Sequence, residues 1–244
     1  FLLPYKRTAA SESFVEYVLY MLWDMGLKVG HATRSIADCV TQAQKDMTIR
    51  TSMLESRFLW GAPSLYADFR ETFIQKIMRG TASEFVTAKL DERDARHERT
   101  GRSRYLVEPN LKESKGGLRD LNTLFWIARY SYQVEELDAL VELKVLTADE
   151  LKLFRKCEAF LWQVRCHLHF NTGRAEERLS FDVQKSLAEF FYPMKEAKEG
   201  AAGMKPVEKF MRRYFLVAKS IGDLTAIFCA SLEESQNKPR ALQR

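Results

Sequence analysis

The sequence predicts a mainly α protein, in which a helical-bundle domain follows a shorter part of mixed α/β character. Apolar residues recur at three- and four-residue steps over most of the 244 residues. Glycine and proline are few, at 11 and 6, which disfavours a turn-rich all-β sandwich. Hydrophobic residues make up 46% of the chain, enough for a substantial core, so intrinsic disorder is excluded.

The first part, residues 1–62, is expected to alternate strands and helices. Gly26 is a plausible end for the first helix, and Ser35 is the expected N-cap of the second. The elements expected here are the end of a strand at 1–3, a helix from 11 to Gly26, a β-branched strand over 27–33, a helix from about 36, and a helix from 46 to near 61.

Residues 63–244 show no further strand pattern and are expected to form the helical domain. Two breaks interrupt it, a charged loop over 102–117 and a surface loop over 193–206. The expected helices are 64–78, 82–99, 119–132, 137–143, 148–171, 182–192 and 206–232.

Charge and cysteine usage restrict the possible partners and location. The net charge of +5 is small and interleaved with acid, so the basic clusters 93–104 and Arg212-Arg213 are interpreted as solvated faces and no nucleic-acid partner is expected. No apolar run approaches the ~18 residues that a membrane span needs, so no membrane partner is expected. The four cysteines are scattered, which predicts reduced thiols in the cytoplasm. The first residues lack the features of a signal peptide, and the chain resembles an internal piece of a longer protein.

The charged loop before residue 118 carries the most unusual local chemistry. Gly116 and Gly117 permit close approach of a ligand, and a helix start beside Lys115 and Arg119 suits a phosphate. The alternative is a tight turn, in which Gly117 supplies a positive φ while Arg119 and Asp120 pair with neighbours. Local chemistry alone leaves both interpretations open, because the loop lacks the Walker A pattern.

A second candidate lies at 30–34, where a titratable ring and a guanidinium end the expected strand. Ligands often bind at such strand ends in open α/β sheets. Strand alternation, however, places His31 and Thr33 on one face and Arg34 on the other. A hydrogen-bonded packing role for His31 is the alternative.

Other catalytic patterns are missing from the sequence. His167 and His169 are two apart in an expected helix and cannot share a metal face. No histidine is followed by aspartate, and no serine or cysteine hydrolase signature is present. The turn 173–182 is expected to hold arginine–carboxylate pairs within itself. Three tryptophans in helical patterns are expected in the core: Trp60, Trp126 and Trp162.

Three segments together carry a family resemblance: 27–35 (LKVGHATRS), 103–120 (SRYLVEPNLKESKGGLRD) and 172–179 (TGRAEERL). They resemble the bifunctional PII protein uridylyltransferase/uridylyl-removing enzymes over essentially 1–234. The Gly-Gly-Leu-Arg-Asp block also has a looser counterpart in glutamine synthetase adenylyltransferases. Three such blocks in the same order make coincidence improbable.

The resemblance implies a polymerase-β-type nucleotidyltransferase, a helical domain, a phosphohydrolase domain and two ligand-sensing ACT domains. Residues 1–62 would be the end of the nucleotidyltransferase domain and 63–244 the helical domain. The paired aspartates that bind Mg²⁺ are expected before Phe1, so no catalytic residue or metal ligand is assigned within the chain, and the chain alone is expected to be inactive.

The activity that the resemblance implies is transfer of UMP from UTP to a tyrosine of the PII signalling protein when glutamine is scarce, and its hydrolytic removal when glutamine is plentiful. Lys115, the glycine pair and Arg119 would position the triphosphate or shape the site, while Glu108 and Asp120 hold the loop. The rival hypothesis is a non-catalytic helical scaffold over 63–244 that docks PII or neighbouring domains. The candidate nucleotide- or substrate-binding residues are His31, Arg34, Glu108, Lys115, Gly116, Gly117, Arg119 and Asp120.

Overall fold

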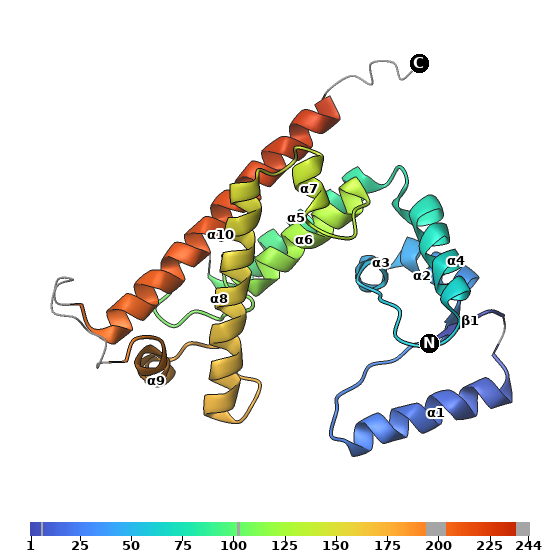
Figure 1. Ribbon diagram of the computed structural model, residues 1–244, viewed down its shortest axis with the longest axis horizontal. Coiled ribbons are helices and arrows are strands. Elements are labelled where there is room, and N and C mark those ends of the chain that lie inside the picture. The colour runs from blue at the N-terminus through green and yellow to red at the C-terminus, as the bar shows by residue number, and fades with distance from the viewer. Residues whose placement is uncertain (6, 102, 194–203, 238–244) are drawn as a thin grey trace. The chain divides into compact units, whose positions relative to one another are not determined.

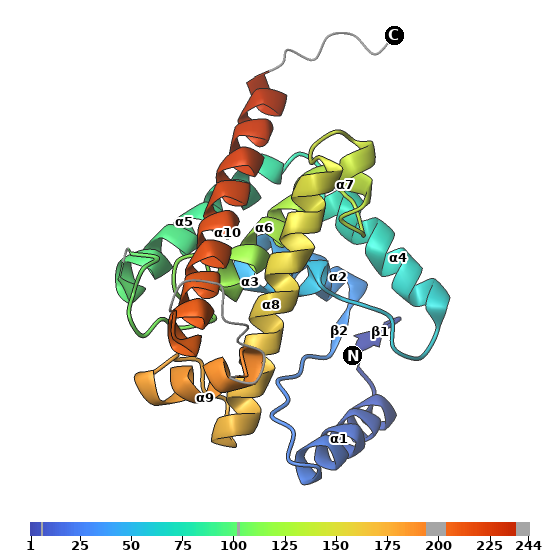
Figure 2. The ribbon, with the colours of Figure 1, turned by 60° about the vertical axis from the view of Figure 1, so that its left-hand side comes forward.

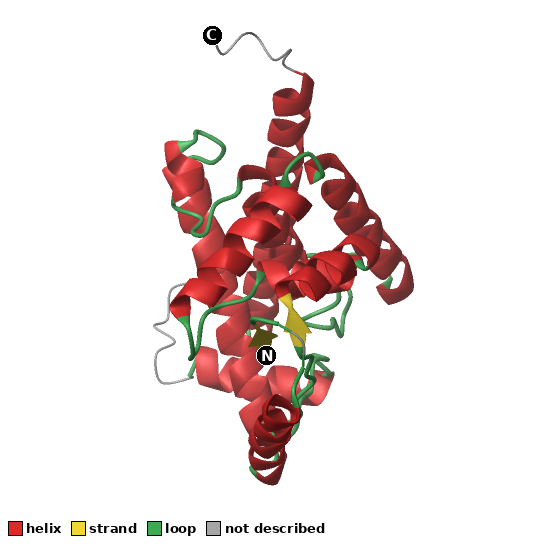
Figure 3. Ribbon diagram, turned by 90° about the vertical axis from the view of Figure 1, so that its right-hand side faces the viewer, coloured by secondary structure: helices red, strands yellow, loops and turns green. Residues whose placement is uncertain are grey.

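The computed structural model describes residues 1–5, 7–101, 103–193 and 204–237, without the side chains of 233–237. Within these residues it confirms a mainly α protein, with ten α-helices and one sheet of two short strands (Figure 3). The chain forms two compact units, Phe1–Val86 and Thr87–Arg244.

Unit 1 contains the small sheet and the first helices. The two strands pair in parallel, with Leu2 opposite Arg34 and Leu3 opposite Ser35 (β1 is labelled in Figure 1, and both strands are labelled in Figure 2). The elements in chain order are β1 (Leu2–Leu3), α1 (Ala9–Asp24), β2 (Arg34–Ser35), α2 (Ile36–Lys45), α3 (Met47–Leu54), α4 (Pro63–Phe73) and the π-helical turn η1 (Ile74–Met78).

The expected strand over 27–33 is wrong, and β2 is confined to two residues. Gly26 closes α1 as predicted, with a φ of +78° and its N–H donating to Trp23 O at 2.8 Å. The following segment then runs without a ladder, because β1 offers only two residues to pair with and the first of them faces Arg34. A β-branched composition does not make a strand without a partner.

Side-chain caps fix the starts of α2 and α3. Ser35 forms the predicted N-cap as part of a capping box, in which Ser35 and Asp38 each accept the other's backbone N–H. Asp46 accepts the backbone N–H groups of Thr48 and Ile49 at 2.7 and 3.0 Å. Helix α3 ends at Leu54 rather than near 61. Residues 55–62 instead form the connection to Pro63, the first residue of α4.

The boundary between the two compact units, after Val86, lies later in the chain than the boundary at 62/63 that the sequence predicts. Phe69 and Phe73 of α4 and Ile77 of η1 are buried, and both elements pack against α2. They therefore belong to the first compact unit rather than to the helical one. The assignment of 1–62 to a nucleotidyltransferase domain stays a prediction.

Unit 2 is a set of helices arranged around α10, which packs against α6, α8 and α9 (Figure 2). Much of the expected loop 193–206 lies outside the described residues. The helices are α5 (Ala82–Thr100, entering from unit 1), α6 (Leu118–Tyr132), α7 (Ala139–Glu142), α8 (Ala148–Thr172), α9 (Phe181–Phe191) and α10 (Pro206–Asn237).

One stripe of α10 supplies much of this core. Within Pro206–Leu232, one 18-residue window reaches a mean hydropathy of 1.6, so this helix is by length and composition apolar enough to cross a membrane, although charged residues interrupt its apolar run. Its packing against three helices accounts for the apolar residues that face them, while 28% of that window is buried within the described residues. The stripe consists of Phe210, Tyr214, Ala218, Ile221, Leu224, Phe228 and Leu232.

Three tryptophans were predicted to lie in the core, and the structure confirms this prediction for one of them. Trp126 of α6 is buried, whereas Trp162 of α8 is 43% exposed and Trp60, before α4, is 84% exposed. Helical periodicity locates the apolar face of a segment, but it does not show whether anything covers that face.

Candidate functional site

The charged loop before α6 is held by its own polar side chains. The Asn110 carboxamide oxygen accepts the backbone N–H groups of Lys112 and Glu113 at 3.0 and 2.8 Å. The hydroxyl of the buried Ser114 accepts the Asn110 N–H at 2.9 Å. These short-range bonds fix the loop conformation without a ligand.

The N–H groups at the start of α6 have acceptors within the same loop. Leu118 and Arg119 donate to the carbonyls of Leu111 and Lys112, each at 2.9 Å, and Gly117 donates to the Ser114 carbonyl at 2.8 Å. A phosphate would have to displace these bonds to use the backbone amides. The side chains of Lys115 and Arg119 are therefore the groups through which the loop would meet an anion.

The glycine pair is required by close packing. Gly116 has a φ of +81°, and a Cβ built on it would lie 2.5 Å from the carbonyl oxygen of Ala218 in α10. A Cβ on Gly117 would lie 2.6 Å from the carbonyl oxygen of Leu111. The sequence-based interpretation gave the positive φ to Gly117. That assignment is wrong, because Gly117 is the extended N-cap of α6, with a φ of −86°, and the turn is made one residue earlier.

Asp120 is the centre of a buried charge network. It is 5% exposed, and its carboxylate accepts hydrogen bonds from Arg96 Nη2 at 2.5 Å and from the Gly116 N–H at 2.8 Å. The imidazole Nε2 of His97 lies 3.0 Å from both carboxylate oxygens. Burial acts to raise the pKa of Asp120, but the hydrogen bond and charge of His97, the Gly116 N–H and the charge of Arg96 outweigh it and lower the pKa.

This network corrects the interpretation of 93–104 as a solvated face at two residues, Arg96 and His97, whereas Asp94, Glu98 and Arg99 are exposed as expected. Arg96 is 4% exposed and His97 is 9% exposed, and both point from α5 toward the start of α6. The sequence contains no local signal for them, because the partner Asp120 is 23 or 24 residues away. Asp120 itself was correctly expected to hold the loop through side-chain contacts.

Tyr214 of α10 lies against the same network. It is fully buried, and its hydroxyl has no hydrogen-bond partner among the described residues. Burial and the negative charge of Asp120 raise the pKa of Tyr214 well above its usual value. The phenol therefore stays protonated, and α10 contributes a neutral polar group to an otherwise charged site.

Glu108 joins the loop to the turn after α8. Its carboxylate accepts from Arg178 Nη2 at 2.6 Å and from the Phe181 N–H at 3.0 Å. Backbone bonds from Leu111 N–H to Glu177 O and from Leu179 N–H to Pro109 O lie beside it. The structure thus brings two of the three sequence blocks, 103–120 and 172–179, together into one assembly.

The arginine–carboxylate pairs of the turn 173–182 lie only partly within it. Arg174 pairs with Glu176 at 2.7 Å, as predicted. Glu177 instead accepts three hydrogen bonds from Arg165 of α8, and Arg178 pairs with Glu108 of the loop. The turn is therefore a structural junction between helices.

Arg119 and Lys115 remain partly accessible beside this assembly. The Arg119 guanidinium lies 3.5 Å from Glu113 and 5.9 Å from the ring centroid of Trp126. Lys115 is half-buried. Both cations lie at the same loop, but Arg119 already has a carboxylate and an aromatic ring as neighbours.

His31 and Arg34 lie together in unit 1, at an open polar hollow of about 650 Å³. Alternation was expected to separate them, but the segment before Arg34 is not a strand and both line the hollow with Arg7 and Asp38. Arg7 donates to the Thr33 carbonyl at 2.9 Å. Hydrogen bonds from Ser35, with smaller contributions from the two arginines, lower the pKa of Asp38, so the hollow carries fixed charges of both signs.

No group of three histidine, cysteine, aspartate or glutamate side chains among the described residues could hold a metal ion. Asp38 and Asp120, a carboxylate at each candidate site, already bind their own neighbours. These residues therefore do not fit the Mg²⁺ that the resemblance implies.

Comparison with known proteins identifies the family. The profile of the family described as GlnD PII-uridylyltransferase matches residues 84–229, more than half of the chain. The "bifunctional uridylyltransferase/uridylyl-removing enzyme" of Bradyrhizobium diazoefficiens is 58% identical over 239 residues, which are 98% of this chain and 25% of that protein. Proteins of the same name from Rhodopseudomonas palustris and Azospirillum brasilense are each 56% identical, with the same coverage.

The chain thus spans about a quarter of the length of these relatives. No solved structure matches it. The matched profile covers almost all of the described helices of unit 2, including the loop, the glycine pair and the buried Asp120 network. The chain therefore belongs to the GlnD PII-uridylyltransferase family.

Proposed function

We propose that the chain is an internal part of an enzyme that transfers UMP from UTP to a tyrosine of the PII protein and also removes it hydrolytically. The glutamine level determines which of the two reactions the enzyme performs. The observation that carries this proposal is 56–58% identity over 98% of the chain to enzymes named for uridylyl transfer and removal. In the transfer, the tyrosine oxygen attacks the α-phosphorus of UTP and pyrophosphate leaves. The enzyme works in the cytoplasm.

The residues at the two candidate sites have different roles in this proposal. Arg34 and His31, which line a polar hollow in unit 1, bind the phosphates of the nucleotide. Lys115 and Arg119 provide side-chain cations at the loop of unit 2. Gly116 and Gly117 fix the backbone there, and Glu108 and Asp120 hold the loop to the turn after α8 and to α5.

The metal chemistry of the transfer belongs elsewhere in the parent enzyme. Mg²⁺ bound by paired aspartates would neutralise the triphosphate and activate the attacking oxygen. The resemblance to polymerase-β-type nucleotidyltransferases supports placing those aspartates outside the 244 residues. The chain alone is therefore expected not to uridylylate PII.

The test compares the 244-residue chain with its parent enzyme, using UTP labelled at the α-phosphorus, PII and Mg²⁺. The parent should transfer label to PII, and the chain alone should not. Label transferred by the purified chain, free of parent enzyme, would overturn the placement of the catalytic carboxylates. A parent that transfers no label would overturn the proposed activity itself.

A second function, a helical scaffold without contact to nucleotide, is favoured by one observation. The backbone amides at Gly117, Leu118 and Arg119 are already hydrogen bonded within the loop. Addition of UTP and Mg²⁺ separates the two functions. If neither unit shows a change in melting temperature or in amide chemical shifts while the chain still binds PII, the scaffold function is correct.

A further inference from the structure

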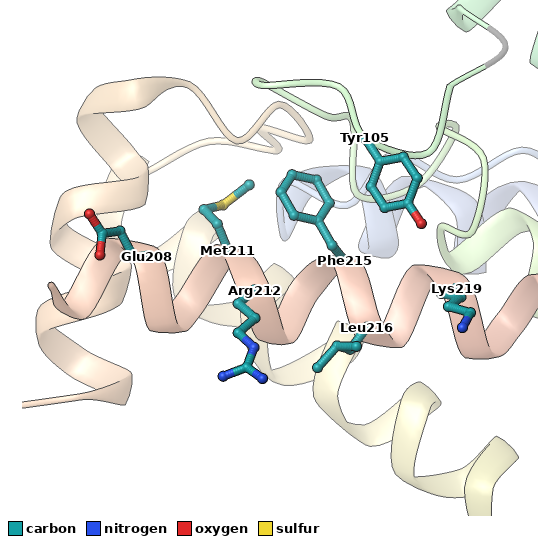
Figure 4. Close-up of a pocket in the computed structure, with 7 residues that line it drawn as sticks. All are labelled: Tyr105, Glu208, Met211, Arg212, Phe215, Leu216 and Lys219. Atoms are coloured by element: carbon teal, nitrogen blue, oxygen red, sulfur yellow. The ribbon is translucent and has the colours of Figure 1, made fainter. Parts of the chain in front are cut away.

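An apolar groove runs along the exposed side of α10 in unit 2. It has a volume of about 420 Å³ and an almost entirely apolar lining. Figure 4 shows Met211, Phe215 and Tyr105 above the α10 ribbon and Arg212 and Leu216 below it, and all five line the groove. The Tyr105 and Phe215 rings meet edge to face, with centroids 5.7 Å apart, so the loop and the helix form one surface.

The groove exposes the residue types that dominate protein interfaces. Tyr105 is 60% exposed and Leu216 is 54% exposed, although both lie beside the nearly buried Met211. Tyrosine and arginine are enriched among the residues that contribute most to binding, and a helix groove of this kind typically receives an apolar segment of another chain. The observed surface has the composition of an interface core flanked by charge.

Two cations flank the apolar lining without a carboxylate partner among the described residues. Arg212 and Lys219 are both exposed, and neither takes part in an ion pair there. The neighbouring Arg213, by contrast, lies 4.4 Å from the Phe160 ring centroid. Glu208, at the end of the groove, accepts the Lys205 N–H at 3.1 Å and so caps the start of α10. The free charge along the groove is therefore positive.

The spacing of these cations defines the complementary charges. Seven residues of α-helix rise about 10 Å. A segment in the polyproline II conformation presents carboxylates three residues apart on one side, about 9 Å from each other, and a helix presents carboxylates seven residues apart on one side, about 10 Å from each other. Such a segment, with an apolar side chain between two acidic ones, matches Arg212, Leu216 and Lys219 in order.

We propose that this groove docks an acidic, apolar segment of the protein substrate, which is PII if the proposed function is correct. The apolar side chain enters between Tyr105, Phe215 and Leu216, and the carboxylates pair with Arg212 and Lys219 at the rim. Rim charges of this kind act mainly on association rate and on salt dependence, while the apolar core provides the residence time.

The test measures binding of purified PII to the 244-residue chain by isothermal titration calorimetry. The double reversal R212E/K219E should weaken binding at least tenfold and remove most of its salt dependence, and L216S should weaken it severalfold. The matched control K152E/K156E makes the same change of net charge on exposed residues of α8 and should leave the affinity unchanged. The control for L216S is F170S, since Phe170 is 82% exposed outside the groove.

Several results would overturn the docking proposal: no binding by the unmodified chain, equal weakening by both charge reversals, or equal affinity in all variants. If R212E/K219E abolishes self-association or lowers the melting temperature, a second copy or another part of the chain occupies the groove, and the proposal is again wrong. The proposed function fails in a different way: the parent enzyme would bind PII at the groove but would transfer no UMP to it.

Discussion

Replacing Gly116 with alanine should destabilise unit 2 by about 2–5 kcal/mol. A Cβ at a φ of +81° costs roughly 1–2 kcal/mol because the left-handed region is unfavourable for residues with a side chain. The same Cβ would lie 2.5 Å from the carbonyl oxygen and 2.7 Å from the Cα of Ala218, so α10 or the loop must shift. Overpacking of this kind adds roughly 1–3 kcal/mol.

Gly173→Ala is the matched control for the steric part of this effect. Gly173 ends α8 in the same unit with a φ of +64°, and a Cβ there would meet nothing within 4 Å. It should therefore show the conformational cost alone, roughly 1–2 kcal/mol. Urea unfolding can be followed through the fluorescence of the buried Trp126. Equal destabilisation by the two variants would refute the packing argument.

Further predictions concern the buried network, the loop cation and the thiols. Asp120→Asn should cost unit 2 roughly 3–5 kcal/mol in urea unfolding by leaving the buried Arg96 without its carboxylate, whereas the exposed Asp182→Asn should cost less than about 1 kcal/mol. Because the folded pKa of Asp120 is lowered, its contribution is complete above the unfolded value of about 3.9 and is lost as the pH falls through the folded pKa; stability should decline less steeply in acid for Asp120→Asn, and an unchanged acid profile would contradict this. In the parent enzyme, Arg119→Ala should reduce UMP transfer at an unchanged melting temperature while sparing hydrolysis of uridylylated PII, and parallel loss of both activities with a lower melting temperature would assign Arg119 to structure alone. Burial raises the pKa of Cys157 to about 11, so a thiol reagent at pH 8 should label the exposed Cys166 and leave Cys157 unlabelled until the chain unfolds, as mass spectrometry of the labelled peptides can check.

Periodicity and capping predicted the helices of this chain well because both are local. The apolar repeat located every described helix of unit 2 to within a few residues, and Ser35 and Gly26 marked helix ends as they do in the structure. The strand expected at 27–33 failed, since a strand depends on a partner that composition does not reveal.

The candidate site was predicted only in part, because the contacts that build it also depend on partners distant in the sequence. Asp120 and Glu108 were identified as residues that hold the loop, but their partners lie 23 to 73 residues away in the sequence. Arg96 was assigned to a solvated surface because a basic helical run has that meaning in most sequences. Pairing between distant charges follows from tertiary packing, and one sequence read alone does not specify it.

The hydrogen bonds between the loop before α6 and the turn after α8 also have a consequence for synthesis of the chain on the ribosome. Leu111 donates to Glu177, and Glu108 accepts from Arg178 and Phe181. A nascent chain that ends within α8 contains the glycine pair and α6 but none of these partners. The bonds within the loop can therefore form early, but the loop cannot complete its native hydrogen bonds until the beginning of α9 has emerged from the ribosome.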